Sequence, residues 1–171
     1  MPHGMIWPVA AALLVCSHAG ASDIRRVVTG LDANNRSMAM FDSRVPLAPV
    51  PNDLGLANLW VTDTYPPGFT FKADTVSKSV GISPPEHGTQ FGVVEFPPLD
   101  PANPAKPLWH RTRTVDYVVV LSGEIDLMLD EQVVRLKAGD TIVQQATNHA
   151  WLNRGKESCR LLFVLMDAKE P

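Results

Sequence analysis

The sequence predicts an all-β fold built as a closed or nearly closed double sheet. Fifteen prolines and eleven glycines are scattered between short apolar runs, which is too frequent an interruption for long helices. Ile125, Leu127 and Leu129 alternate with polar residues, as in a strand that has one wet face. From Leu108 onward, turn-forming pairs recur at short intervals, and the many strands between them hide their edges best in a closed structure.

The size and charge of the chain indicate one domain without a polyanionic partner. In 171 residues, 45% of them hydrophobic, there is room for one core and little for a second, so we expect a single domain over residues 22–171. The chain has 15 Lys and Arg and 18 Asp and Glu, and it has no dense run of either charge. Binding to nucleic acid or to an anionic membrane is therefore not indicated. Cys16 and Cys159 are far apart, with no CxxC pair, so neither a zinc ribbon nor a disulfide framework is indicated.

The first 21 residues are expected to lie outside the fold. An apolar stretch from Ile6 to Cys16 precedes Ala19-Gly20-Ala21, the small-x-small pattern of a signal-peptidase site, which indicates a signal peptide and a periplasmic or secreted protein. The leader before this stretch has no Lys or Arg. The alternative is an upstream extension ahead of a start near Ser22, which leaves the protein cytoplasmic. In either case the stretch is too short for a stable membrane span.

The first half of the domain is expected to hold an N-terminal hairpin and two further strands. The turn-forming Asp-Ala-Asn-Asn lies between two short strand patterns, which predicts an antiparallel hairpin. Prolines 46, 49 and 51 are expected to prevent regular structure between residues 42 and 58. The expected strands are Ile24–Thr29, Ser37–Phe41, Leu59–Asp63 and Gln90–Phe96, with loops over residues 64–88 and 97–107.

The second half reads as an antiparallel meander that completes a barrel core over residues 89–167. Its strands are separated by turns at Ser122-Gly123, Asp130-Glu131, Ala138-Gly139-Asp140, Thr147-Asn148 and Arg154-Gly155. Leu161 to Met166 is apolar at every position, which suits a strand covered on both faces, inside a sandwich or at a dimer interface.

Two polar clusters stand out against these strands. With a period of two, His110, Thr112, Thr114 and Asp116 share one face of a strand, and Asp116 opens a strongly apolar run. A carboxylate at the mouth of a core strand needs a cation, a hydrogen-bond donor or a proton. His149, Trp151 and Asn153 form the second cluster after the next turns.

The spacing of these residues resembles the two motifs of the cupin superfamily. The first cupin motif has a His-x-His pair, a Glu three or four residues later and a Gly six residues after that, and this chain has His110-Arg111-Thr112, Asp116 and Gly123. The second motif begins Gly-Asp and ends in His with Asn four residues on, matched here by Gly139-Asp140, His149 and Asn153. The resemblance implies a double-stranded β-helix, or jelly-roll barrel, around a small-molecule pocket.

The chain departs from the family pattern at the residues that usually hold a metal. Thr112 replaces the second His, and Asp116 replaces Glu with a side chain one methylene shorter. Gln145 and Thr147 stand where the family commonly has Pro and Gly, so Gln144 or Gln145 is a candidate source of an oxygen ligand. The resemblance still implies a site for one divalent ion, Fe, Mn, Zn or Ni, on His110, Asp116 and His149.

The same resemblance extends to small single-domain cupins that begin with Ile-Arg-Arg-Val-Val-Thr-Gly and carry His-x-Thr-x-x-x-Asp-Tyr, here Ile24–Gly30 and His110–Tyr117. We expect a homodimer that binds a small-molecule substrate. Its catalytic residues would be His110, Asp116 and His149, and its substrate-binding residues Thr112, Gln144, Gln145, Trp151 and Asn153. His87, in a Pro-Pro-Glu-His-Gly turn, is expected to be a loop residue.

Three functions follow from these residues. A His, an Asp and a second His around one cavity can move a proton next to a carbonyl, with a metal or Asn153 stabilising the enolate, which indicates lyase or isomerase chemistry: decarboxylation, dehydration or enolisation. The alternatives are an Fe(II) dioxygenase and a non-catalytic binding protein. Trp151, Phe91 and Phe96 would suit an oxygenated or aromatic carbon acid as substrate.

Overall fold

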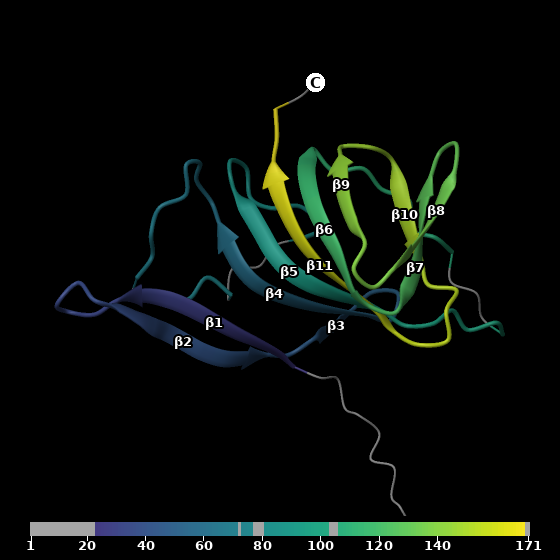
Figure 1. Cartoon of the computed structure of the whole chain (residues 1–171). Coiled ribbons are helices and arrows are strands. Elements are labelled where there is room, and N and C mark those ends of the chain that lie inside the picture. The colour runs from purple at the N-terminus through teal and green to yellow at the C-terminus, as the bar shows by residue number, and fades with distance from the viewer. Residues whose placement is uncertain (1–22, 72, 77–80, 103–105, 170–171) are drawn as a thin grey trace, which may run out of the picture.

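The structure, a computed structural model, describes residues 23–71, 73–76, 81–102 and 106–169, and its secondary structure there is entirely β (Figure 1). One sheet pairs β1 (Ile24–Leu31) with β2 (Ser37–Val45). A second sheet has the order β10 (His149–Leu152), β7 (Glu124–Leu129), β8 (Val133–Lys137). The third has the order β3 (Ala48–Val50), β4 (Leu54–Thr62), β5 (Thr89–Phe96), β11 (Cys159–Asp167), β6 (Thr114–Ser122), β9 (Thr141–Gln145). The all-β double sheet and the N-terminal hairpin are confirmed. The segment 1–21 lies outside the described residues.

The predicted turns are present, but the meander is wrong. Strand β6 pairs with β9 and β11, and β7 pairs with β8 and β10, so between β6 and β11 four of the five connections lead from one sheet to the other. The chain crosses between the sheets at the turns, as a jelly roll requires. Gly123 and Gly139, the two motif glycines at these crossings, have φ of +75° and +95°. Both angles lie in the region that glycine adopts without strain, and a Cβ at Gly123 would come within 2.8 Å of Ser158 O.

The first half of the chain is more regular than predicted. Strand β2 continues to Val45, β3 contains Pro49, and β4 begins at Leu54, all within the region where we expected the prolines to prevent strands. Pro49 is tolerated because β3 is the outermost strand of its sheet, where one side of the backbone needs no ladder partner. Strands β3 and β4 thereby extend the sheet ahead of the expected core. The described parts of residues 64–88 and 97–107 contain no strand, as expected.

The core separates into two clusters on either side of the six-stranded sheet. Inside the barrel, Val118 and Val120 of β6 pack with Ile125 and Leu161 in one cluster. The remaining members of the inner cluster are Leu127, Leu136, Cys159 and Phe163. On the outside, Leu162 and Phe91 pack against a second cluster of Val45, Leu47, Ala57, Leu59 and Val93. This second cluster explains why β11 is apolar on both faces.

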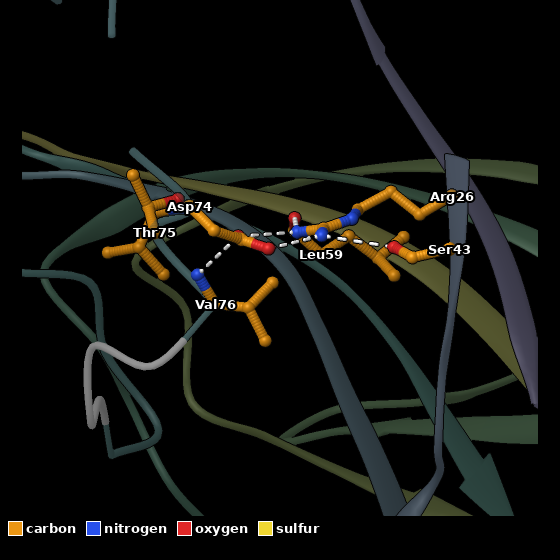
Figure 2. Close-up of polar contacts among 7 residues, drawn as sticks. Arg26, Ser43, Leu59, Asp74, Thr75 and Val76 are labelled. Atoms are coloured by element: carbon orange, nitrogen blue, oxygen red, sulfur yellow. Dashed lines mark hydrogen bonds and ion pairs between the residues drawn. The ribbon is translucent and has the colours of Figure 1, made fainter. Parts of the chain in front are cut away.

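A buried arginine attaches the N-terminal hairpin to the barrel (Figure 2). The Arg26 side chain is only 6% exposed, and it donates hydrogen bonds to Leu59 O of β4 at 3.0 Å and to Asp74 Oδ1 at 2.8 Å. A further bond reaches Ser43 Oγ at 3.2 Å. Asp74 in turn accepts from the Val76 amide at 3.0 Å. One side chain of β1 therefore joins three parts of the fold that are distant in sequence.

None of the described segments forms a helix that could cross a membrane.

Candidate functional site

The barrel contains a cavity of about 200 Å³, and Val118, Leu161 and Phe163 of the inner cluster form part of its lining. One side of its lining is polar, with Gln90, His110, Thr112, Asp116, Gln144 and His149. The remainder is mostly apolar and includes Leu54, Phe96, Leu108, Trp151, Phe163 and Leu165. A small molecule in this cavity would meet ionisable groups on one side and an apolar wall on the other, the usual composition of a ligand site.

Strand register places Asp116 at the centre of the polar side. Asp116 on β6 lies directly opposite Gln144 on β9 and Leu165 on β11, so these three side chains point to the same face of the sheet. That face is the barrel interior, and Asp116 is only 5% exposed. Neighbouring residues point the other way, since successive side chains of a strand alternate. Gln145 is accordingly exposed and does not line the cavity, so the structure does not bring it together with the other residues expected to bind substrate.

His110 and His149 meet although they come from different parts of the chain. A β-bridge joins their backbones with two hydrogen bonds of 3.0 Å, and their ring centroids are 4.2 Å apart. His110 Nδ1 lies 3.0 Å from Leu108 O, a contact in which this nitrogen must carry the proton because a carbonyl can only accept. His149 Nδ1 lies 3.0 Å from Thr147 O and 2.7 Å from Gln144 Nε2. In both rings Nε2 is thus the nitrogen left for the cavity.

Burial favours the neutral forms of the Asp116 carboxyl group and the His149 imidazole. Desolvation raises the pKa of the Asp116 carboxyl above its ordinary value, against opposing effects of a Thr114 hydrogen bond and the His110 charge. Desolvation also lowers the pKa of His149, and the proximity of His110 acts in the same direction, while the Thr147 carbonyl opposes it. Burial thus shifts the pKa of the acid upward and that of the base downward, so both groups are held closer to their neutral forms than they would be in water.

Threonine hydroxyls lie where the cupin motif has its second histidine. Thr112 is 6% exposed, and its Oγ1 lies 2.7 Å from Thr114 Oγ1. Thr114 also makes a side-chain hydrogen bond with Asp116. Hydrogen bonds therefore link Thr112, which lies just before β6, to Thr114, and Thr114 to Asp116 within the strand. These bonds orient the carboxylate, yet Asp116 Oδ1 is buried without any hydrogen-bond partner.

Asn153 does not lie in this cavity, contrary to its assignment to substrate binding and enolate stabilisation. Its Nδ2 donates to Phe96 O at 2.8 Å and to Glu157 O at 2.9 Å, while its Oδ1 accepts from the Gly155 amide at 2.8 Å. These bonds hold the turn that leads into β11. Asn153 lines instead a neighbouring hollow of about 240 Å³, which shares Trp151 with the barrel cavity.

Of the other residues singled out in the sequence, some line the cavity and some do not. The structure brings Thr112, Gln144 and Trp151 to the cavity together with the three proposed catalytic residues. Phe96 also lines it, but Phe91, an odd number of positions away on β5, faces the outer cluster and cannot contact a ligand there. His87 lies in a turn with φ of +58°, as expected of a loop residue, and is not among the residues that line the cavity.

Sequence reasoning missed Gln90, which is 2% exposed and lines the cavity from β5. Its Nε2 donates to Asn58 Oδ1 on β4 at 2.8 Å, and its Oε1 is buried without a partner. The sequence feature that could have identified Gln90 is its position: it is a glutamine on the inward side of a strand whose other inward residues are apolar or small.

The described side chains do not fit a metal ion as they stand. Among residues 23–169, apart from the stretches that the structure leaves undescribed, no three His, Cys, Asp or Glu side chains are grouped so that they could share one ion. Thr112 offers a neutral hydroxyl that is already bonded to Thr114, which makes it a poor ligand. Metal binding by His110, Asp116 and His149 stays a prediction.

Comparisons with known proteins agree with this architecture. A family model described as "Cupin domain" matches residues 92–165. "Phomopsin biosynthesis cluster protein C'" of Diaporthe leptostromiformis is 35% identical over 150 residues, which cover 84% of this chain and 78% of that protein. "Cupin-domain-containing oxidoreductase srdD" of Neurospora crassa is 30% identical over 157 residues, which cover 88% and 79% of the two chains.

Solved structures show the same fold at low identity. The Cnp3 cupin domain of Schizosaccharomyces pombe superimposes with a TM-score of 0.50 and 16% identity, covering 84% of this chain and 89% of that one. An ethanolamine utilization protein Q of Salmonella typhimurium gives a TM-score of 0.50 and 14% identity over 86% of this chain and 99% of that one. At such identities the likeness concerns the fold alone.

Proposed function

Because this chain belongs to the cupin superfamily and its barrel holds ionisable groups in a small cavity, we propose that it is an enzyme acting on a small oxygenated or aromatic carbon acid. The proposed reaction is of the lyase or isomerase kind: enolisation, dehydration or decarboxylation. Relatives named as oxidoreductases and biosynthesis cluster proteins support an enzymatic role without fixing the chemistry. The fold alone cannot select the reaction, so the proposal depends on the side chains of the cavity.

The observation that carries the proposal is the state of Asp116. Its carboxyl group is buried beside two imidazoles, one of its oxygens has no partner, and its pKa is raised. The unpartnered Oδ1 costs folding free energy, which the hydrogen bond between Thr114 and the carboxyl group offsets only in part. Strained ionisable groups in a cavity are typical of sites that handle protons.

In the proposed reaction the Asp116 carboxylate takes the proton from the carbon next to the substrate carbonyl. This forms the neutral acid, the form that the apolar surroundings stabilise. Return of that proton to another atom completes an isomerisation; transfer to a departing hydroxyl releases water. In a decarboxylation, protonated Asp116 instead delivers its proton to the carbon from which CO₂ has left. His110 Nε2 accepts a hydrogen bond from a substrate hydroxyl, because its Nδ1 carries the proton, and His149 Nε2 offers a second polar contact, so that the two rings hold the substrate in place.

Solvent isotope exchange tests this proposal. Candidate keto acids and hydroxylated aromatic acids are incubated with the protein in D₂O, and products are followed by NMR and mass spectrometry. We expect deuterium at the carbon next to the carbonyl, with loss of CO₂ or water where the substrate allows it, and no change in oxidation state. Exchange that continues unchanged in Asp116→Asn would contradict the assignment.

An oxidoreductase is the second candidate, and the name of the Neurospora relative favours it. Oxidation would give a product two mass units lighter, or one that has gained oxygen, in the same mass spectra. An Fe(II) dioxygenase would in addition require iron in the purified protein. A third candidate, a non-catalytic binding protein, would retain a ligand without producing any of these mass changes.

A further inference from the structure

Gln90 and Asp116 each have a buried side-chain oxygen without a hydrogen-bond partner in the described part of the chain, and the proposed reaction uses only that of Asp116. Gln90 Oε1 and Asp116 Oδ1 are both buried, both belong to residues that line the cavity, and neither has a hydrogen-bond partner among the described residues. Buried polar atoms are nearly always paired, so two unpaired acceptors in one small cavity require an explanation. Both atoms can accept a hydrogen bond, and a ligand that donates hydrogen bonds would satisfy them.

The Gln90 side chain is fixed in the orientation that leaves its oxygen unpaired. Its Nε2 donates to Asn58 Oδ1 at 2.8 Å, so the amide nitrogen is committed to the neighbouring strand β4. The opposite end of the same amide, Oε1, is the atom without a partner. Asn58 therefore acts as a positioning residue for Gln90.

The two acceptors lie in one row across the sheet. Gln90 on β5 is directly opposite Leu165 on β11, and Leu165 is directly opposite Asp116 on β6. Adjacent strands are about 4.8 Å apart, so the backbones of Gln90 and Asp116 are separated by about 10 Å. Their side chains extend into the cavity from either side of Leu165, and one ligand lying over Leu165 can reach both.

We propose that Gln90 is a specificity-determining residue that selects substrates with a second hydrogen-bond donor, a hydroxyl or an N–H, at the end remote from the group handled by Asp116. The inference depends on the proposed function, because it takes the cavity to be a substrate site. It adds the substrate class: a flat or cyclic molecule with two donors on one polar edge. Phe96 and Trp151 in the cavity wall suit a ring.

A series of three probes tests the inference by binding rather than turnover. Resorcinol, 3-methoxyphenol and 1,3-dimethoxybenzene share one ring and carry two, one and no donors. Binding is measured by titration while the Gln90 side-chain amide signals are followed by NMR, which places the probe in the cavity. We expect each added donor to strengthen binding to the wild-type protein about tenfold, the effect of a hydrogen bond to a buried acceptor.

Substitution of Gln90 then separates its role from that of the cavity. Gln90→Met has a similar size but no acceptor, and it should reduce resorcinol binding about tenfold while leaving 1,3-dimethoxybenzene unchanged. Asn58→Leu releases the Gln90 amide and should lose most of the preference for probes with hydrogen-bond donors. This variant provides a second measurement if Gln90→Met does not fold. Gln132→Met, an exposed glutamine in the turn after β7, is the matched control.

The outcomes distinguish this inference from the proposed function. If the wild-type protein binds the series but Gln90→Met keeps the full donor preference, the role of Gln90 is overturned and the cavity remains a substrate site. If no probe reaches the cavity of the wild-type protein, the proposed small-molecule site fails and the inference fails with it.

Discussion

The imidazole rings of His110 and His149 lie with their centroids 4.2 Å apart, on backbones that are hydrogen-bonded to each other. Two rings this close cannot both carry a positive charge at low cost, because like charges repel strongly where water is excluded. The pair therefore limits how many protons the cavity can hold. Together with Asp116, whose pKa is shifted in the opposite direction from that of His149, it makes the site sensitive to pH.

Stability should fall in acid because of His149. Burial lowers its pKa in the folded state, so the unfolded chain binds a proton more readily than the folded one. This loss of folding stability is absent above the histidine pKa of the unfolded chain, about 6.5. It grows as the pH falls below that value, until the pKa of His149 in the folded state is reached. We expect the melting temperature to drop between pH 7.5 and 5, and to drop less in His149→Gln. An unchanged pH dependence in the variant would contradict this.

Asp116→Asn should remove activity without unfolding the barrel. A raised pKa means that the folded state holds the Asp116 proton more tightly than the unfolded state, so the ionised group costs stability above its folded pKa. The neutral variant should melt at the same temperature or a few degrees higher at pH 7.5, with the difference disappearing in acid. Turnover and isotope exchange should be lost.

A second buried aspartate provides the control for this substitution. Asp126 is 8% exposed and accepts a hydrogen bond from Arg154 Nε at 2.9 Å, so its charge is paired. Asp126→Asn should lower the melting temperature and leave isotope exchange intact. If Asp116→Asn instead melts much lower and keeps its activity, Asp116 serves the fold and the site assignment is wrong.

Thr112→His should increase metal retention. It restores the His-x-His pair of the cupin motif, and the new imidazole would join His110, Asp116 and His149, all of which line the same cavity. After equal loading with Mn(II) or Ni(II) and desalting, elemental analysis should find more metal in the variant than in the wild-type protein. Arg111→His, one residue earlier and exposed, is the control. Equal metal in Thr112→His and Arg111→His would argue against a metal site on these strands.

Gly92→Ala should destabilise the protein and narrow the cavity. A Cβ at Gly92 would lie 2.6 Å from Phe163 Cζ and 2.8 Å from Ala57 O, so the ring or the strand must shift. Phe163 lines the cavity, and overpacking of this kind costs about 1 to 3 kcal/mol. Urea unfolding should show the loss, and the ring probes should bind more weakly. Gly68→Ala, where the added atom has nothing within 4 Å, should change neither.

We also propose that the exposed part of the outer face, formed by β6 and β9, is a homodimer interface. Tyr117, 50% exposed, lies opposite Val143, 61% exposed, on β9 and opposite Val164 on β11, which gives an apolar row outside the barrel. A second copy packed on this row would bury it. Light scattering should give twice the monomer mass for the wild-type protein and the monomer mass for Val143→Lys. A wild-type monomer would contradict the proposal.

Much of the site could be predicted from the sequence because it depends on local periodicity. Alternation in the sequence predicts that His110, Thr112 and Asp116 share one face, and all three line the cavity, although β6 itself begins only at Thr114 and His110 is held by a separate β-bridge to His149. The turn residues mark where each strand ends. The motif spacing then identifies His149 as the partner of that face, and all four residues line one cavity.

What only the tertiary structure decided is which strands became neighbours. Periodicity fixes the face of a residue within its own strand but carries no information on register with a distant one, so the meander was predicted where the chain crosses between sheets. Gln90 and Arg26 became buried polar residues only because β5 and the N-terminal hairpin pack where they do. Asn153 has the motif position expected of a site residue, yet its amide is used by three backbone groups of its own turn and of β5. Long-range pairing decides these contacts, and local sequence cannot encode it.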